Sequence, residues 1–298
     1  MSFLLERTPP KNPLRRHPVA LPLIIFFLLL ALLGLIGKKA QGPQIGLLKV
    51  EGMILDSSKL LTQIRFLEKQ ESVRGVLLRV DSPGGVVAPS QEIYSALKRL
   101  GQKKPLYVSM GSVAASGGYY VSLAGKQIFA NQGTLTGSIG VILQSLNAKE
   151  LLDKLGLKMQ VVKSGRNKDA GSLFRPMEPE ERKLLESVIM DSHDQFVSAI
   201  AENRPIKRAE LELLADGRIF TGRQAQALGL VDQVGGIEEA LEALKKTLSL
   251  DKEEVELIEP PDPKESFWSP LDLEQVSQIG QLLGQGGLLF MDPKLGPR

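Results

Sequence analysis

The chain has 298 residues and a formal net charge of +3, with no cysteine and two histidines. This length suits one large domain with appendages, and the nearly balanced charge gives no sign of nucleic-acid binding. The lack of cysteine excludes disulfides, cysteine nucleophiles and thiolate metal sites. No cluster of metal-ligating side chains stands out, so the sequence predicts neither a metal nor a cofactor.

The N-terminal region carries an uncharged apolar run, residues 18–37, after a basic segment, residues 1–17. A helix of this length spans about 30 Å, the thickness of the hydrocarbon core of a bilayer. Four basic residues precede the run and two follow it, so residues 1–17 should stay in the cytoplasm. Lysines stand where a cleavage site would need small residues, which favours an uncleaved signal anchor in the plasma membrane. The rest of the chain should then lie on the extracytoplasmic side.

Residues 38–44 are interpreted as a linker, after which strands and helices alternate. Short apolar, β-branched runs predict strands at 45–50 and 76–80, and further strands are expected at 106–110, 127–130, 138–143 and 158–162. Helical periodicity and cap residues predict helices at 57–71, 91–100, 119–124, 149–155, 178–203, 209–214, 222–227 and 237–248. The alternation predicts an α/β fold, with both faces of the sheet covered, over residues 45–257.

Residues 258–298 form a C-terminal extension, in which a linker rich in proline and charge precedes an apolar tail. Glycines interrupt any helix in the tail, which carries several leucines with Phe290 and Met291. We expect an extended arm that docks on an apolar surface, or a disordered end. One hypothesis is that the tail enters the substrate groove of a neighbouring copy.

Two glycine-rich segments follow predicted strands. In the first, DSPGG at residues 81–85, a proline and paired glycines make a tight turn with freely oriented N–H groups. Such a turn suits an oxyanion hole, although an ordinary strand-to-helix connection has the same composition.

The second segment, MGSVAASGGYY at residues 110–120, lies between a predicted strand and a predicted helix. Strand, tight turn, serine and helix make up a nucleophile elbow. Ser116 suits this role because small residues stand two positions to either side, whereas the rival Ser112 has less suitable neighbours. The N–H of Gly117 would stabilise an oxyanion together with a glycine of the DSPGG turn.

The base that accepts the serine proton is not an available histidine. His17 lies on the cytoplasmic side of the expected anchor, and His193 has the spacing of a helix-packing residue. The segment VVKSGRNKDAGS offers Lys163 and Lys168 instead. A lysine has an ordinary pKa of about 10.4, so a base near neutral pH needs a dry site that lowers it.

Together these segments resemble the signal peptide peptidase A family in its short form, a family of membrane-anchored serine proteases. The resemblance covers about residues 45–248 and rests on five motifs in order, DSPGG, MGSVAASGGYY, TGSIGV at 136–141, KSGRNKD at 163–169 and DGRIFTGRQAQALGLVDQVGG at 216–236. It implies a ClpP/crotonase-like spiral of β-β-α units, preceded by one transmembrane helix.

The resemblance also implies roles for individual residues. Ser116 would be the nucleophile and Lys168 the general base, since the family's lysine directly precedes the Asp position of its motif, which selects Lys168 over Lys163. Ser138 would orient the lysine. The oxyanion hole would come from Gly85 and Gly117, with Gly84 as a further donor.

The implied activity is a Ser-Lys endopeptidase that degrades signal-peptide remnants and other peptides at the membrane. The resemblance further implies a ring- or dome-shaped homo-octamer whose serine and lysine come from neighbouring subunits. Two alternatives are a crotonase-like acyl-CoA enzyme, and a catalytically inactive scaffold or regulator. The anchor argues against the first alternative, and the intact serine and lysine argue against the second.

Overall fold

The structure is a computed structural model that describes residue 26, residues 42–262 and residues 289–291. The chain divides into two units, residues 1–42 and residues 43–298. In the described part of the chain, no helix is both long and apolar enough to cross a membrane. The expected anchor, residues 18–37, lies outside the described residues except for Phe26, which is in a helix.

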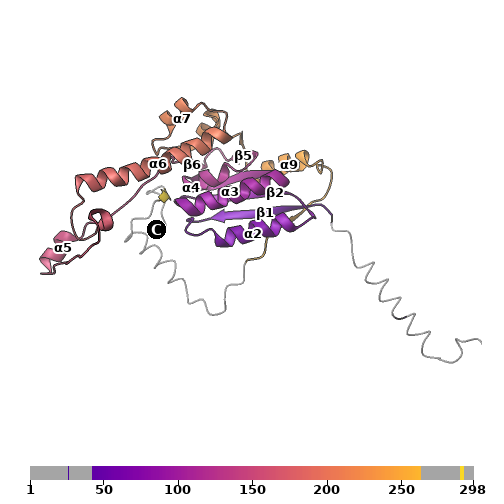
Figure 1. Ribbon diagram of the computed structural model, residues 1–298. Coiled ribbons are helices and arrows are strands. Elements are labelled where there is room, and N and C mark those ends of the chain that lie inside the picture. The colour runs from indigo at the N-terminus through magenta and orange to yellow at the C-terminus, as the bar shows by residue number, and fades with distance from the viewer. Residues whose placement is uncertain (1–25, 27–41, 263–288, 292–298) are drawn as a thin grey trace, which may run out of the picture. The chain divides into compact units, whose positions relative to one another are not determined.

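A mostly parallel sheet forms the centre of the second unit (Figure 1). Its main path runs through β7 (Ile219–Thr221), β6 (Leu135–Gly137), β4 (Leu106–Ala115), β2 (Val73–Ser82), β1 (Gln44–Glu51) and β9 (Glu256–Ile258). Two further strands branch from β4, namely β5 (Gln127–Ala130) and then β8 (Gln233–Val234). Among these pairs only β6 with β7 is antiparallel, so the α/β prediction is confirmed.

Helices cover both faces of this sheet. The helices of the described chain are α2 (Ser58–Lys69), α3 (Val87–Lys103), α4 (Gly117–Ser122), α5 (Lys149–Lys154), the 3-10 turn η2 (Arg166–Asp169), α6 (Pro179–Asn203), α7 (Arg208–Leu214), α8 (Gly222–Ala227) and α9 (Ile237–Thr247), of which α5 and η2 have no buried residue and do not cover the sheet. The larger apolar core includes Leu48 of β1 and residues of α2, α3, α4 and α6. A smaller core joins Leu47 of β1 to Leu244 of α9. Neighbouring residues of one strand thus enter opposite cores, as the alternation of a pleated strand requires.

Most predicted elements are present with small changes in length. The strands expected at 45–50, 76–80, 106–110 and 127–130 lie within β1, β2, β4 and β5, and every predicted helix has a counterpart. The strand expected at 138–143 is wrong: β6 ends at residue 137, and Ser138 has a φ of 49°, which breaks the extended backbone. The strand expected at 158–162 is also wrong, because these exposed residues have no partner strand in the described chain.

A short two-stranded sheet, absent from the sequence prediction, lies beside the main one. Strand β3 (Gly84–Val86) pairs antiparallel with β10 (Leu289–Met291). The other edge of β3 is held by Ile54, whose N–H donates to Gly84 at 2.9 Å and whose carbonyl accepts from Val86 at 2.7 Å. The DSPGG segment therefore continues into a strand rather than a simple turn.

Candidate active site

The two glycine-rich segments meet because β2 and β4 are parallel neighbours, so their carboxyl ends lie at the same edge of the sheet. At that edge α4 packs against the DSPGG turn. A Cβ at Gly118 would stand 2.6 Å from the carbonyl oxygen of Ser82. Only glycine permits this approach, which brings the start of α4 against the start of β3.

Strand β4 carries a bulge just before the candidate nucleophile. Val80 pairs with Met110 and Ser82 pairs with Ala114, so two steps along β2 match four steps along β4. The bulge re-aims the end of β4 relative to its neighbour. It therefore sets the direction from which the chain enters the turn at Ser116.

Side chains from neighbouring segments satisfy the backbone of this bulge. The carboxylate of Asp81 accepts the N–H of Val113 at 3.0 Å, and the hydroxyl of Thr134 donates to the carbonyl of Gly111 at 2.7 Å. The Asp81 carboxyl also fills the space that a Cβ at Gly111 would need. This role of Asp81 was not predicted from the sequence, where the only signal is an acidic residue at the end of a buried strand.

Ser116 stands at the turn between β4 and α4, as predicted. Its φ of 53° and ψ of −116° lie outside the regions that a non-glycine residue ordinarily adopts. The residue is fully buried, and its Oγ has no hydrogen-bond partner among the described residues. A buried unpaired hydroxyl on a strained strand-to-helix turn is typical of a nucleophile elbow.

Ser138, the residue expected to orient the lysine, lies beside Ser116. The N–H of Ser116 donates to the carbonyl of Gly137 at 2.8 Å, which places Ser138 next to the nucleophile position. Ser138 is buried and has a positive φ, and its N–H donates to the carbonyl of Arg218 at 2.8 Å. Ser116 and Ser138 are therefore brought together from segments 22 residues apart, since 138 − 116 = 22.

The three candidate oxyanion glycines differ in their backbone contacts. The N–H of Gly84 donates to the hydroxyl of Ser82 at 3.1 Å. The carbonyl of Gly84 faces Ile54, so the alternation along β3 turns the N–H of Gly85 toward the opposite edge, where β10 lies. Gly117 is buried and is the first residue of α4, where helix N–H groups point outward. The N–H groups of Gly85 and Gly117 are therefore better candidates for an oxyanion hole than the N–H of Gly84, which is already bonded to Ser82.

Ser112 and the two histidines are the alternative candidates for nucleophile and base. Ser112 is exposed within β4 and is not at a turn. His193 lies in the middle of α6, and its Nε2 is 2.8 Å from the carbonyl oxygen of Ala215, which fits the expected helix-packing role. His17 lies outside the described residues.

The two candidate lysines lie in an arm made of α5, η2 and the first turns of α6. Lys163 pairs with the carboxylate of Asp169, and its Nζ donates to the carbonyl of Arg166 at 2.9 Å. Lys168, in η2, is exposed, and it makes no hydrogen bond to the Ser116 hydroxyl within the described chain. Figure 1 shows α5 beyond the N-terminal end of α6, away from the sheet.

Charged side chains surround the turn that carries Lys168. Hydrogen bonds from Arg175, then from Lys163, hold the pKa of Asp169 well below its ordinary range. Arg175 also lowers the pKa of Glu181 to about 2 through hydrogen bonding. Composition alone could not single out these residues from the other surface charges.

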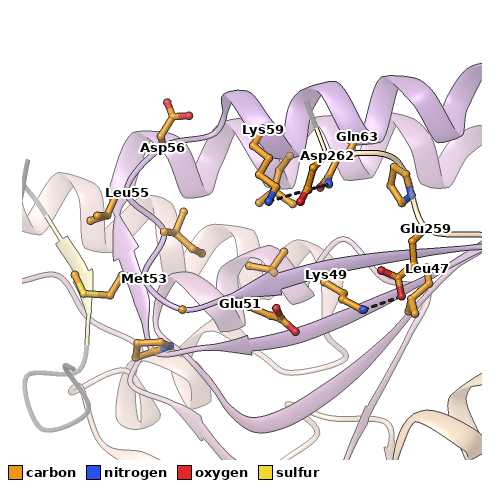
Figure 2. Close-up of a pocket in the computed structure, with 16 residues that line it drawn as sticks. Leu47, Lys49, Glu51, Met53, Leu55, Asp56, Lys59, Gln63, Glu259 and Asp262 are labelled. Carbon is orange, nitrogen blue, oxygen red and sulfur yellow. Dashed lines mark hydrogen bonds and ion pairs between the residues drawn. The ribbon is translucent and has the colours of Figure 1, made fainter. Parts of the chain in front are cut away.

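A pocket elsewhere on the described domain is separate from these residues. It has a volume of about 950 Å³ and lies between β1, the loop of residues 52–56 and α2 (Figure 2). Ion pairs from Lys49 to Glu259 and from Lys59 to Asp262 cross its rim at 2.7 Å and 2.8 Å. Neither candidate serine lines it, although Pro83 connects it to the start of β3. This pocket therefore does not contain the Ser116 hydroxyl.

That edge of β3 is occupied by the C-terminal tail of the same chain. Phe290 pairs with Gly85, and Met291 pairs with Gly84. An extended peptide can therefore pair with β3 beside the candidate oxyanion donors. Entry of the tail into a neighbouring copy stays a hypothesis.

Comparisons with known proteins agree with this arrangement. Residues 98–251 match the model of peptidase family S49, and residues 50–135 match that of Clp protease. The α/β domain is therefore ClpP-like, as the sequence resemblance implied.

Curated relatives point the same way. The chain is 42% identical to a "Putative protease" of Synechocystis, covering 76% of this chain and 82% of that protein. It is 39% identical to the "Putative signal peptide peptidase SppA" of Enterococcus faecium, covering 71% and 65%. It is 33% identical to the chloroplastic serine protease SPPA of Arabidopsis thaliana, covering 77% of this chain but only 34% of that protein. The chain belongs to peptidase family S49 and is a serine peptidase.

Proposed function

We propose that this chain is a membrane-anchored serine endopeptidase in which Ser116 attacks the peptide and Lys168 of a neighbouring copy is the general base. One observation carries the proposal. The Oγ of Ser116 is buried on an elbow turn without a described partner, while Lys168 is exposed on the arm and makes no hydrogen bond to that hydroxyl within the described chain. A second copy that places its arm over the elbow would bring the two groups together.

The reaction follows from these positions. Ser116 Oγ attacks the scissile carbonyl carbon and passes its proton to Lys168 Nζ. The N–H groups of Gly85 and Gly117 stabilise the oxyanion of the tetrahedral intermediate. As the C–N bond breaks, Lys168 returns the proton to the leaving amine, which leaves an acyl ester on Ser116.

Water then completes the cycle. Lys168 takes a proton from the attacking water molecule, whose oxygen bonds to the ester carbon. When the ester bond breaks, the proton passes to Ser116 Oγ and the second peptide product leaves with a new carboxyl group. Ser138, beside Ser116, would orient the amine of Lys168 throughout.

The surface of the arm supports assembly into an oligomer. Large apolar side chains are exposed there, namely Leu151, Leu155, Leu157, Met159 and Val162, the last fully exposed. Monomeric proteins rarely leave such patches uncovered. The segment at 158–162, which forms no strand in the described chain, would be covered by a neighbouring copy.

The proposed substrates are extended peptides that pair with the edge of β3 that β10 occupies in this structure. Signal-peptide remnants fit this site and the expected anchor at residues 18–37, and one relative carries the name of a signal peptide peptidase. The plasma membrane, with the catalytic domain on its extracytoplasmic side, is the proposed location.

A mixing experiment tests the shared site. Full-length Ser116→Ala and Lys168→Ala proteins, each inactive alone, are co-assembled in detergent and tested on a fluorogenic peptide. A head-to-tail ring of randomly mixed chains should recover about a quarter of the wild-type sites. If co-assembly is proven and no activity returns, serine and lysine do not come from different chains.

A further inference from the structure

The segment that carries the candidate base is not held by a hydrophobic core. Every residue from 142 to 180 is at least partly exposed, so the described chain has no buried residue between Val141 and Glu181. The turn η2 lies inside this stretch. Apolar packing within the chain therefore cannot fix the position of Lys168, and polar contacts must do so.

One arginine makes those contacts. The Nε of Arg175 donates to Asp169 Oδ2 at 3.1 Å, and its Nη2 donates to Asp169 Oδ1 at 2.9 Å. The same Nη2 donates to the backbone carbonyl of Asp169 at 3.2 Å. Arg175 thus grips both the side chain and the backbone of the residue that directly follows Lys168.

The same guanidinium reaches the first turn of α6. Its Nη1 donates to Glu181 Oε2 at 2.8 Å, and Nη2 contacts the other oxygen. Glu181 Oε2 also accepts the N–H of Glu178 at 3.0 Å, which closes the cap of the helix. The side chain of Glu181 is only 2% exposed, so this pair is a covered contact and not a solvated one.

Helix α6, which Arg175 contacts through Glu181, is itself anchored in the apolar core. Its far half enters the main core through Phe196, Val197 and Ile200, which are all buried. A contact to the first turn of this helix is therefore a contact to a rod anchored in the core.

We propose that Arg175 is the positioning residue of the lysine base: it ties the turn carrying Lys168 to the first turn of α6. This inference rests on the proposed function, because it needs Lys168 to be the base. The amine of Lys163 forms an ion pair with the carboxylate of Asp169. Lys168, by contrast, is exposed. The tether fixes the backbone of Lys168 and leaves its side chain available.

The role demands an arginine. A planar guanidinium with five N–H donors can bridge two carboxylates in fixed directions, whereas an ammonium is a point charge. Arg175→Lys should therefore keep the charge but lose much of the geometry. Arg208 is a matched control, since it also pairs with two carboxylates, Asp194 and Glu212, on an exposed surface away from η2.

The test uses the full chain in detergent and a fluorogenic peptide. Arg175→Gln should lower kcat by about 100-fold with little change in KM, the cost of a misplaced catalytic group. Arg175→Lys should recover part of the loss, and Arg208→Gln should match wild type. Hydrogen exchange should show faster exchange of amides 163–175 in Arg175→Gln, with amides 190–203 unchanged.

Three results would overturn the inference: an Arg175→Gln enzyme with normal kcat, a loss of kcat with unchanged exchange at 163–175, or a loss confined to KM. If Arg175→Gln does not assemble, Glu181→Gln weakens the same tether with a side chain of similar size, and the same outcomes apply.

Lys168→Ala separates this inference from the proposed function. If Lys168→Ala is active, the base assignment fails and takes the inference with it. If Lys168→Ala is inactive and Arg175→Gln is unimpaired, the inference alone fails.

Discussion

The backbone N–H of Ser116 donates a hydrogen bond to the carbonyl of Gly137 at 2.8 Å. This contact continues the pairing of β4 with β6 beyond Ala115 and brings two serines side by side at the ends of parallel strands. The elbow is therefore not an isolated turn, because a neighbouring strand supports it.

The first prediction concerns Gly85. A Cβ at this position would stand 2.1 Å from the carbonyl oxygen of Ile54, a backbone atom that cannot turn aside. Gly85→Ala should displace β3, destabilise the fold by about 1–3 kcal/mol as overpacking does, and abolish most peptidase activity. Thermal unfolding and peptide cleavage would measure both effects.

Gly133 provides the control for this substitution. A Cβ there would have no atom within 4 Å, so Gly133→Ala should leave the melting temperature and activity near wild type. Equal behaviour of the two alanine variants would show that the close approach of Ile54 to β3 is unimportant.

The second prediction concerns the tail. Because β10 occupies the edge of β3, ending the chain after Gly280 should raise kcat/KM for a short peptide and leave kcat unchanged. The rise should be about tenfold for a competitor held by about 1.4 kcal/mol. Ending the chain at Met291 keeps β10 and should have no effect. Identical kinetics for both truncations would rule out competition by the tail.

The third prediction concerns Ser138. Its removal takes one hydrogen bond from the proposed base, worth about 1 kcal/mol, so Ser138→Ala should lower kcat by about fivefold and leave KM nearly unchanged. Ser112→Ala, which alters an exposed serine of β4, should be fully active. Steady-state kinetics would measure both variants. A large loss of kcat in Ser112→Ala would contradict the choice of Ser116 and Ser138 over Ser112.

The fourth prediction is a pH dependence of stability. Arg175 lowers the pKa of Glu181 to about 2, so the carboxylate stabilises the fold fully above its ordinary pKa of about 4.3. That contribution is lost as the pH falls through about 2. The gap in melting temperature between wild type and Glu181→Gln should be constant from about pH 5 to pH 8 and shrink below about pH 4. A gap that closes already near pH 6 would contradict this ion pair.

Much of the fold could be predicted because its central strands carry local signals. Val76–Val80 and Leu106–Met110 are mostly apolar runs, each with a single interior polar residue, as is typical of strands buried on both faces. Ser116 could be singled out from its small neighbours and its position after a strand. These signals lie within a few residues of each feature.

Other features depend on contacts between distant segments. Strand β3 contains two glycines in three residues, so only its pairing with Ile54 and β10 makes it a strand. Residues 158–162 end in two β-branched valines but have no partner strand in the described chain. The link from Arg175 to Glu181 joins charges whose burial no local pattern reveals.

The most direct test of the central claim is fluorophosphonate labelling of the full-length protein, with the modified residue located by mass spectrometry. Wild type and Lys163→Ala should be labelled at Ser116, Lys168→Ala should be labelled far more slowly, and Ser116→Ala should not be labelled. Equal labelling of Ser116→Ala and wild type, or of Lys168→Ala and wild type, would contradict the Ser116–Lys168 pair.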